Sequence, residues 1–219
     1  MPPSSKKLGR PTNTALRARR RDEILDAAAR LFAERGYAAA DTQSLSDALG
    51  IGKGTLYRHF ASKRDLFLAA VNRAMDRLDE RIEQALASVA DPIDRFEAAI
   101  TAYLRFFNEN PEVTELLIQE RALFKGIRKP AYFERNEACA ERKHEMLAEL
   151  MRAGRLRAMP VDRIGRVLGD QLYGTMLANF FAGRRDSVAD QAEAIVDVMF
   201  HGILTDRERA SRNPSSPSR

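Results

Sequence analysis

Residues 50–59 read GIGKGTLYRH, and this stretch decides how the surrounding chain folds. Its first residue, Gly50, favours a tight turn, because glycine adopts a positive φ without steric cost. Leucines flank the turn at the spacing of packed helices: Leu45, Leu49 and Leu56. The pattern therefore predicts two short helices, about 42–49 and about 53–59, joined by a tight turn.

The second of these short helices is polar along most of its length. It contains five side chains that can donate hydrogen bonds, and no acid: Lys53, Thr55, Tyr57, Arg58 and His59. A helix that only faces solvent rarely has this composition, whereas such groups suit phosphates and base edges. The two helices are therefore predicted to form a helix-turn-helix whose second helix contacts DNA and is anchored inward by Leu56 alone.

Positive charge is concentrated at the N-terminus. Of the net charge of +5, residues 1–21 carry +7 and no acid, which leaves −2 for the rest of the chain. Such a segment suits a polyanionic partner, and it is equally compatible with a solvated, disordered tail. Arg10 lies between Gly9 and Pro11, and an arginine held in such an extended turn can enter the narrow minor groove of A·T-rich DNA.

The rest of the chain has the pattern of one helix after another. Apolar residues recur at helical spacing, separated by glycines, by helix-starting prolines and by capping residues. Thr42 is predicted to cap the second helix, and a capping box at 62–65 to open a long fourth one. Helices are predicted over about 22–35, 42–49, 53–59, 62–89, 92–109, 112–124, 130–153, 160–182 and 187–204. Because no strand-like alternation occurs, the predicted fold class is all-α with about nine helices.

Composition places further limits on the protein. A chain that is 44% hydrophobic and 31% charged is typical of globular proteins. The single cysteine, Cys139, excludes an internal disulfide and fits a reducing cytosol. No apolar run approaches the roughly 20 residues of a membrane span, and the basic N-terminus lacks the apolar core of a signal peptide. A cytoplasmic, nucleoid-associated location is therefore predicted.

Residues 22–68 resemble the DNA-binding domain of the tetracycline-repressor (TetR) family. The matching positions are Leu31, Phe32, Gly36, Tyr37, Thr42, Leu45, Gly50, Ile51, Gly54 to Tyr57, His59, Phe60, Ser62, Lys63 and Leu66. The remainder is similar to that family only in helix count and layout. The resemblance implies a homodimeric, all-helical transcription regulator with an operator-binding N-terminal domain and a C-terminal domain that binds a small effector. Repression is the usual mode of the family, but the sequence does not decide between repression and activation.

Carried over position by position, the resemblance implies roles for individual side chains. Thr42 would contact a phosphate, Gln43 a base edge, and Lys63, at the positive end of the long helix, another phosphate. Three side chains would enter the major groove: Lys53, Thr55 and Arg58. Two would hold phosphates: Tyr57 and His59. The chain departs from the family at Gly52, where relatives often have a capping hydroxyl, so base preference cannot be transferred.

The last two predicted helices have apolar stripes that resemble the dimerisation helices of the family. The predicted dimer interface comprises Leu172, Met176, Phe180, Ile195, Val196, Met199, Phe200 and Ile203. A dimer suits a short DNA-binding helix, because two such helices on a palindrome bind better than one. Ordinary core packing is the alternative for each of these residues.

The resemblance also implies an effector pocket in the middle of the chain, for an apolar or aromatic compound. The predicted lining comprises Tyr103, Phe106, Phe107, Leu117, Gln119, Glu120, Phe124, Tyr132, Phe133 and Met176. Simple core filling is the alternative for the aromatic residues, and exposed ion pairing for the charged ones.

The predicted organisation has four parts: a flexible basic arm over 1–21, a helix-turn-helix domain over 22–68, an effector-binding and dimerisation domain over 69–204, and a disordered tail over 205–219. No metal site or cofactor is predicted. An enzyme is a competing interpretation, but Cys139 and His144 are not spaced to share a helical face, and no catalytic motif occurs. A DNA-binding architectural protein without an effector remains the other alternative.

Overall fold

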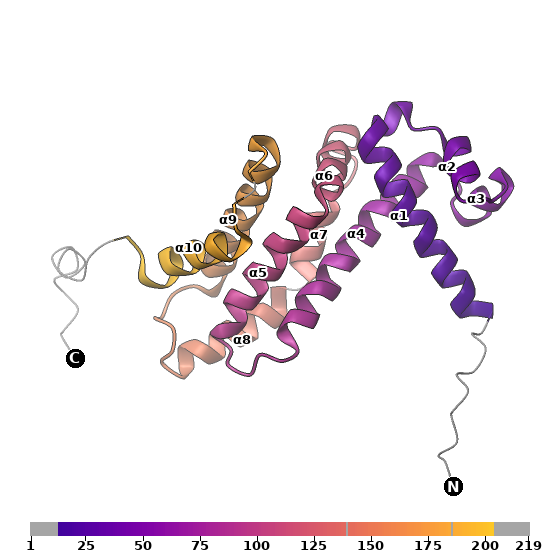
Figure 1. Cartoon of the computed structure of the whole chain (residues 1–219). Coiled ribbons are helices and arrows are strands. Elements are labelled where there is room, and N and C mark those ends of the chain that lie inside the picture. The colour runs from indigo at the N-terminus through magenta and orange to yellow at the C-terminus, as the bar shows by residue number, and fades with distance from the viewer. Residues whose placement is uncertain (1–12, 139, 185, 204–219) are drawn as a thin grey trace, which may run out of the picture. The chain divides into compact units, whose positions relative to one another are not determined.

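The computed structural model describes residues 13–138, 140–184 and 186–203, and within these ranges every regular element is a helix (Figure 1). The predicted all-α fold is confirmed. The ten helices are α1 (Asn13–Ala39), α2 (Thr42–Ala48), α3 (Lys53–His59), α4 (Lys63–Leu86), α5 (Asp94–Glu109), α6 (Pro111–Leu123), α7 (Ala131–Ala138), α8 (Ala140–Arg152), α9 (Val161–Ala182) and α10 (Val188–His201). The predicted helix over 130–153 corresponds to α7 and α8, between which residue 139 lies outside the described residues.

The helices pack into two compact units. Of the described residues, unit 1 comprises 13–77 and 112–137, and unit 2 comprises 78–111, 138, 140–184 and 186–203. By packing, the chain therefore divides differently from the predicted domains over 22–68 and 69–204. In unit 1, α6 and α7 join the helix-turn-helix region, because the ring of Phe124 packs 5.9 Å from that of Phe67 and 6.1 Å from that of Tyr37.

The first helix begins earlier than predicted. It starts at Asn13 rather than Asp22, so residues 13–21 of the predicted flexible arm are helical. One local and one long-range contact explain part of this extension, because the guanidinium of Arg20 donates to Glu23, three residues on, and to the carbonyl of Leu49. Arg10 and the predicted tail over 205–219 lie outside the described residues.

A glycine separates α2 from α3 as predicted, whereas the first helix, predicted to stop at Gly36, continues beyond it to Ala39. Gly36 interrupts α1 with a φ of 73°, and Gly50 has a φ of 62°. Both values lie in the left-handed region that glycine tolerates best. The cap of α2 was predicted wrongly: Asp41, not Thr42, is the capping residue, because its carboxylate accepts the backbone N–H groups of Gln43 and Ser44.

The predicted capping box at the start of α4 is confirmed. The hydroxyl of Ser62 accepts the N–H of Asp65 at 3.1 Å and donates to the Asp65 carboxylate at 2.7 Å. The helix then continues for 24 residues, ending at Leu86, slightly short of its predicted end.

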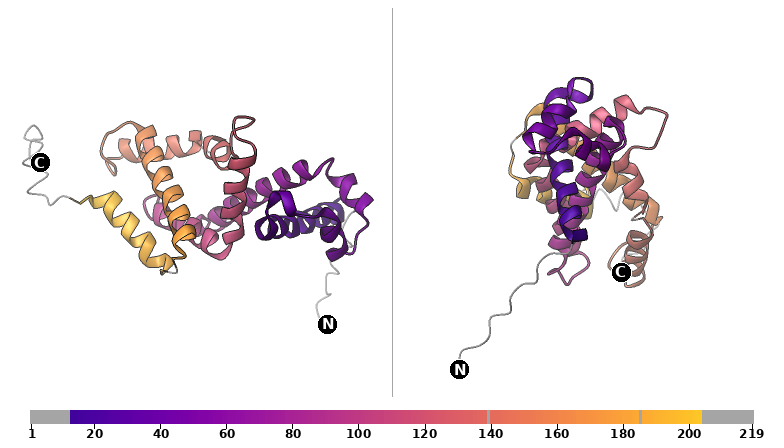
Figure 2. Two further views of the ribbon diagram at one scale, coloured as in Figure 1. Left: turned by 90° about the horizontal axis from the view of Figure 1, so that it is seen from above. Right: turned by 90° about the vertical axis from the view of Figure 1, so that its right-hand side faces the viewer.

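Each unit has its own apolar core. In unit 1 the buried side chains include Ile24, Leu25, Phe32, Leu56, Leu66 and Phe67. In unit 2, Phe96, Leu147 and Leu150 form the centre of a cluster contributed by α5 and α8, with α9 packed against it. Both α9 and α10 contact α5, and Figure 2 shows α9 and α10 diverging from the turn between them. No helix in the described ranges combines the length and the hydropathy needed to cross a lipid bilayer.

Candidate nucleic-acid interface

The short helix α3 presents a polar surface and buries one side chain. Leu56 is 1% exposed and is the only buried residue of α3. Lys53, Tyr57 and Arg58 are exposed, while Thr55 and His59 are half-buried. The five predicted contact residues of this helix are therefore all at least partly open to a partner.

A hydrogen bond joins α2 to α3 at this surface. The hydroxyls of Thr42 and Tyr57 lie 3.1 Å apart. Thr42 is only 7% exposed, and its carbonyl accepts the hydroxyl of Ser46 at 3.0 Å. The phosphate contact of Thr42 stays a prediction. In the structure, the Thr42 hydroxyl holds the exposed Tyr57 ring in one orientation.

The acids nearest to this surface are engaged in local hydrogen bonds. The N–H of Gln43 and, next, the hydroxyl of Ser44 hold the pKa of the Asp41 carboxyl below its usual value. Asp47 accepts the side-chain amide of Gln43 at 2.8 Å. Gln43 is thus exposed, as a base contact requires, but its amide has a partner on α2.

Lys63 occupies a defined position at the start of α4. Its ammonium donates to the carbonyl of Ala38 at 3.0 Å and lies 5.1 Å from the ring centre of Tyr37. An ammonium has three hydrogens, so two remain for an anion while the bond to Ala38 persists. The geometry is compatible with the predicted phosphate contact.

Two arginines that the sequence placed in the flexible arm support the helix-turn-helix instead. The guanidinium of Arg20 donates at 2.7 Å to the carbonyl of Leu49, at the end of α2. Arg21 lies 5.4 Å from the ring centre of Phe60, just after α3. The last carbonyls of any helix need donors, but sequence alone did not indicate which of the clustered arginines would supply them.

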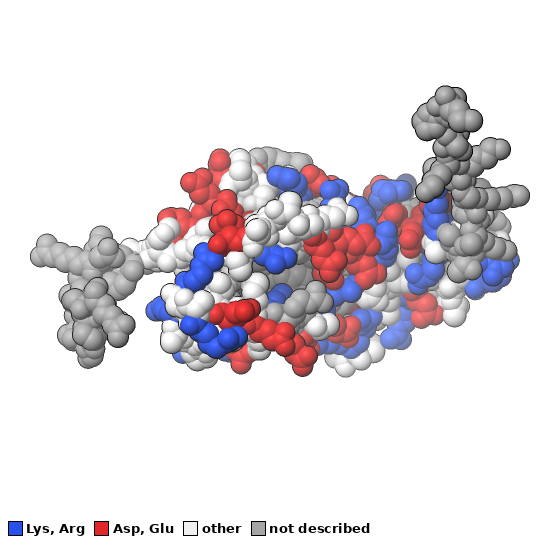
Figure 3. Space-filling model, turned by 90° about the horizontal axis from the view of Figure 1, so that it is seen from below, with Lys and Arg blue, Asp and Glu red and all other residues white. Residues whose placement is uncertain are grey.

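The face of the molecule in Figure 3 shows how charge is distributed. Basic and acidic side chains are interspersed over this face. Charges of both signs that lie close together leave little net field over the face as a whole.

The ten predicted pocket residues divide between the two units. In unit 2, Tyr103, Phe106, Phe107 and Met176 are buried. The Tyr103 hydroxyl lies 3.8 Å from the sulfur of Met176. In unit 1, Leu117, Glu120, Phe124 and Tyr132 are buried, Gln119 is half-buried and Phe133 is 38% exposed.

Glu120 is a buried carboxylate in unit 1. It is 1% exposed and accepts the N–H of Ala131, at the start of α7, at 3.1 and 3.2 Å. Burial raises the pKa of this carboxyl, and the Ala131 N–H and the Arg128 guanidinium, 3.7 Å away, oppose the rise. Glu120 and Phe124 line a cavity of about 240 Å³ beneath the loop that follows α6.

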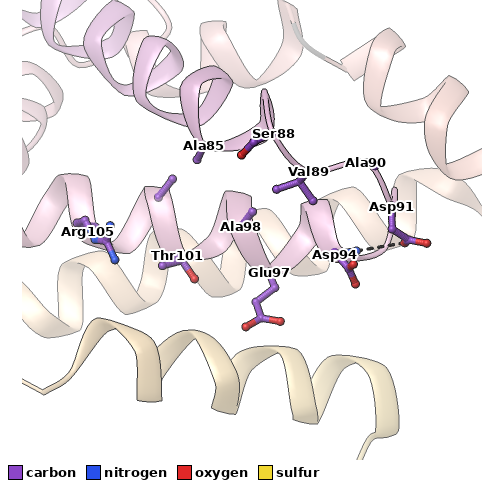
Figure 4. A pocket seen from close by; sticks show the side chains of 11 residues that line it. Ala85, Ser88, Val89, Ala90, Asp91, Asp94, Glu97, Ala98, Thr101 and Arg105 are labelled. Atoms are coloured by element: carbon purple, nitrogen blue, oxygen red, sulfur yellow. Dashed lines mark hydrogen bonds between the residues drawn. The ribbon is translucent and has the colours of Figure 1, made fainter.

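A larger, open groove of about 690 Å³ lies in unit 2, between the end of α4 and α5. None of the predicted pocket residues lines it. Figure 4 shows Ala98 facing the loop and the carboxylate of Glu97 pointing away from it. Asp91, also on the groove, accepts the guanidinium of Arg155 at 2.7 Å, and this bond is the main cause of its lowered pKa.

The predicted dimer residues differ in exposure within the chain. Met176 and Ile195 are buried inside unit 2, and Phe200 and Ile203 are 38% and 85% exposed. The others are half-buried: Leu172, Phe180, Val196 and Met199. Three further apolar residues, missed from the sequence, are also exposed: Val167, Phe181 and Val198. Val167 and Phe181 are fourteen positions apart, which places them on one face of α9. This spacing could have indicated from the sequence that the two residues share a surface.

The region considered for catalysis shows an ion pair. His144 lies 2.8 Å from a carboxylate oxygen of Asp162, and Cys139 lies outside the described residues.

Comparisons with known proteins match this geometry. Residues 24–70, which span the later part of α1, all of α2 and α3 and the start of α4, match the family model described as bacterial regulatory proteins, tetR family. The transcriptional activator FasR of Mycolicibacterium smegmatis is 36% identical over 107 residues, which cover 49% of each chain. The nucleoid occlusion factor SlmA of Aliivibrio fischeri is 28% identical over 171 residues, covering 76% of this chain and 85% of SlmA.

A solved structure extends the similarity beyond the helix-turn-helix. The TetR-family regulator PfmR of Thermus thermophilus is 28% identical, with a TM-score of 0.66, and the match covers 83% of this chain and 99% of PfmR. The chain spans about half the length of the first curated relatives that it matches. These relatives and this fold are those of transcription regulators and not of enzymes. Residues 24–70 therefore form a DNA-binding domain of the TetR family, and the chain as a whole is similar to TetR-family transcription regulators.

Proposed function

We propose that this regulator binds a palindromic operator as a homodimer and that a small apolar or aromatic effector releases it. The observation that supports it best is the surface of α3, where three hydrogen-bonding side chains are exposed, two more are half-buried and only Leu56 is buried. A helix with that surface, held against α2, has the form of a helix that enters the major groove.

Exposed apolar side chains on the last two helices support the dimer. Phe181 on α9 is 71% exposed and Val198 on α10 is 52% exposed. Exposed apolar groups on adjoining helices are typical of a protein–protein contact. A two-fold axis through such a contact would present two copies of α3 to a palindrome.

Selection of bound sequences from random duplex DNA tests the operator and the dimer together. We expect a palindrome whose half-sites are about one helical turn apart, or a multiple of it. Selection of single, unpaired half-sites would exclude the dimer, and no enrichment above non-specific binding would exclude operator recognition.

Arg58→Ala is expected to relax specificity at one base-pair position. The side chain is exposed on α3, and a bidentate arginine–guanine contact contributes about 1–3 kcal/mol to discrimination. Dissociation constants for single-base operator variants measure the effect, with the exposed Arg157→Ala in unit 2 as the control. Equal weakening on every variant would show that Arg58 contacts a phosphate instead.

Lys63→Ala is expected to weaken binding to all DNA sequences similarly. The change removes one phosphate contact, so the slope of log K against log salt should become shallower by roughly one unit. Titrations at several salt concentrations measure the slope, and Lys143→Ala, an exposed lysine on α8, is the control. An unchanged slope would exclude Lys63 as a phosphate contact.

Thermal-shift screening with apolar and aromatic compounds tests the effector. A compound at a hundred times its dissociation constant stabilises the folded chain by about 2.7 kcal/mol. An effector should also weaken operator binding, because the two affinities are thermodynamically linked. A compound that binds without changing operator affinity would contradict this coupling.

An architectural DNA-binding role without an effector is the second candidate. The similarity to a nucleoid occlusion factor over 76% of the chain favours retaining it. Many scattered sites with no response of nearby promoters would support this role. Repression is the usual mode of the family, but the relative FasR is named an activator. A reporter gene placed behind the selected operator therefore also shows whether the protein represses or activates transcription.

A further inference from the structure

Gln119 of α6 is hydrogen-bonded to the backbone of α1 on both sides of its interruption. Its amide oxygen accepts the N–H of Tyr37 at 2.9 Å, and its amide nitrogen donates to the carbonyl of Phe32 at 3.0 Å. These residues are more than 80 positions apart in the sequence. The three residues all belong to unit 1.

The interruption at Gly36 explains why α1 needs an outside partner there. Its ψ of 156° is far from helical values and turns the next peptide N–H, that of Tyr37, out of the helical direction. A half-buried N–H without a partner is destabilising, so a side chain from elsewhere is required. Gln119 supplies the acceptor.

The amide side chain of Gln119 satisfies both groups. Tyr37 presents a donor and Phe32 an acceptor, and Gln combines an acceptor with two donors. The second amide hydrogen is donated to the carboxylate of Glu115 at 2.8 Å, one turn earlier on α6. The orientation of the Gln119 amide is therefore fixed by three partners.

The segment that Gln119 holds also positions Lys63. The Tyr37 ring lies under the Lys63 ammonium, and the carbonyl of the next residue, Ala38, accepts its hydrogen bond. Three residues beyond Ala38, Asp41 caps α2. One short connection thus determines the position of a predicted phosphate contact and the start of the helix-turn-helix.

We propose that Gln119 is a positioning residue of the DNA-binding surface, which holds the connection after Gly36 in the conformation that places Lys63 against the operator. The inference rests on the proposed function, because it assumes that Lys63 contacts a phosphate. Helix α6 lies outside the residues that match the family model. Under this proposal it stabilises the DNA-binding region through direct hydrogen bonds.

Gln119→Met tests the proposal, because methionine has a similar length, is only a weak acceptor for the Tyr37 N–H and has no hydrogen to donate to the carbonyl of Phe32. We expect operator affinity to fall about tenfold, within the range by which positioning residues modulate a distant site. The affinity falls because the free chain populates the binding-competent conformation less. Gln84→Met, at an exposed site on α4, should bind as the wild type does.

A double-mutant cycle separates positioning from a general structural role. When Lys63 is already alanine, Gln119→Met should cost less than about threefold, because its main route of action has been removed. Additive losses would overturn the proposal, as would unchanged affinity of the single variant. Thermal unfolding of each variant confirms that binding is measured on folded protein.

Two further variants keep the test decisive if Gln119→Met unfolds. Gln119→Glu retains the acceptor for Tyr37 but sets a carboxylate against the Phe32 carbonyl, and should also weaken binding. Glu115→Ala retains both backbone bonds and should bind within about twofold of the wild type, because an isolated side-chain pair on a helix contributes little. The reverse order of these two effects would overturn the proposal. If the wild type itself selects no operator, the proposed function fails and this inference fails with it.

Discussion

A Phe181→Asp chain is expected to be monomeric and to bind its operator roughly a hundredfold to ten-thousandfold more weakly than the wild type, which is the range that linking two binding sites contributes. Phe181 is 71% exposed on α9. A carboxylate at the centre of an apolar contact would lose its hydration without gaining a partner, which strongly disfavours the dimer. Binding by one α3 then lacks the second half-site.

Sedimentation and operator titration on the same samples measure both effects. Phe181→Leu retains an apolar side chain and should remain dimeric. Ile127→Asp places the same charge at an equally exposed apolar residue, 63% exposed, in the loop between α6 and α7. It should leave the oligomeric state unchanged. A Phe181→Asp chain that still sediments as a dimer would place the interface elsewhere.

Local chemistry made much of the fold predictable. Gly36 interrupts α1 and Gly50 follows α2 because each adopts a positive φ, a preference that belongs to the residue itself. The capping box of Ser62 and Asp65 involves residues three apart, so its signal lies in a short window. The all-α class followed from many such local signals.

The errors arose where local signals compete or where distant residues decide. Thr42 and Asp41 are both good capping residues. The sequence alone did not decide whether the Asp41 carboxylate or the Thr42 hydroxyl would accept hydrogen bonds from the first N–H groups of α2. The bond from Arg20 to the carbonyl of Leu49 spans 29 positions. The grouping of α6 with the helix-turn-helix depends on contacts of Phe124 with Tyr37 and Phe67, which no local pattern announces.

In the candidate site, too, features set by neighbouring residues could be predicted, whereas features set by distant contacts could not. The polar face of α3 could be predicted because its residues are contiguous and Leu56 alone fits the core. The predicted pocket residues could not be assigned to a cavity, because apolar residues at helical spacing pack equally well into a core or around a ligand. Gln119 was predicted as a polar pocket residue, and its bonds to Phe32 and Tyr37 became visible only in three dimensions.

Leu56→Ala is expected to destabilise unit 1 by about 2–5 kcal/mol, the usual range for a buried leucine, and to abolish specific operator binding. The helix has seven residues, too few for stability on its own, and Gly54 weakens it by roughly another 1 kcal/mol relative to alanine. Leu56 is its only buried residue, so α3 depends on this side chain for its attachment. Chemical denaturation and operator titration measure the two effects.

Matched variants distinguish loss of α3 from general loss of stability. Leu147→Ala removes a leucine that is 3% exposed in the core of unit 2, and should be similarly destabilising while operator binding is kept at temperatures where the chain is folded. Leu56→Met conserves volume and should cost less than about 1.5 kcal/mol. If Leu56→Ala binds its operator normally well below its unfolding temperature, α3 does not depend on this anchor. Recognition would then have to come from residues outside α3, because a detached seven-residue helix cannot hold five side chains in register with the bases.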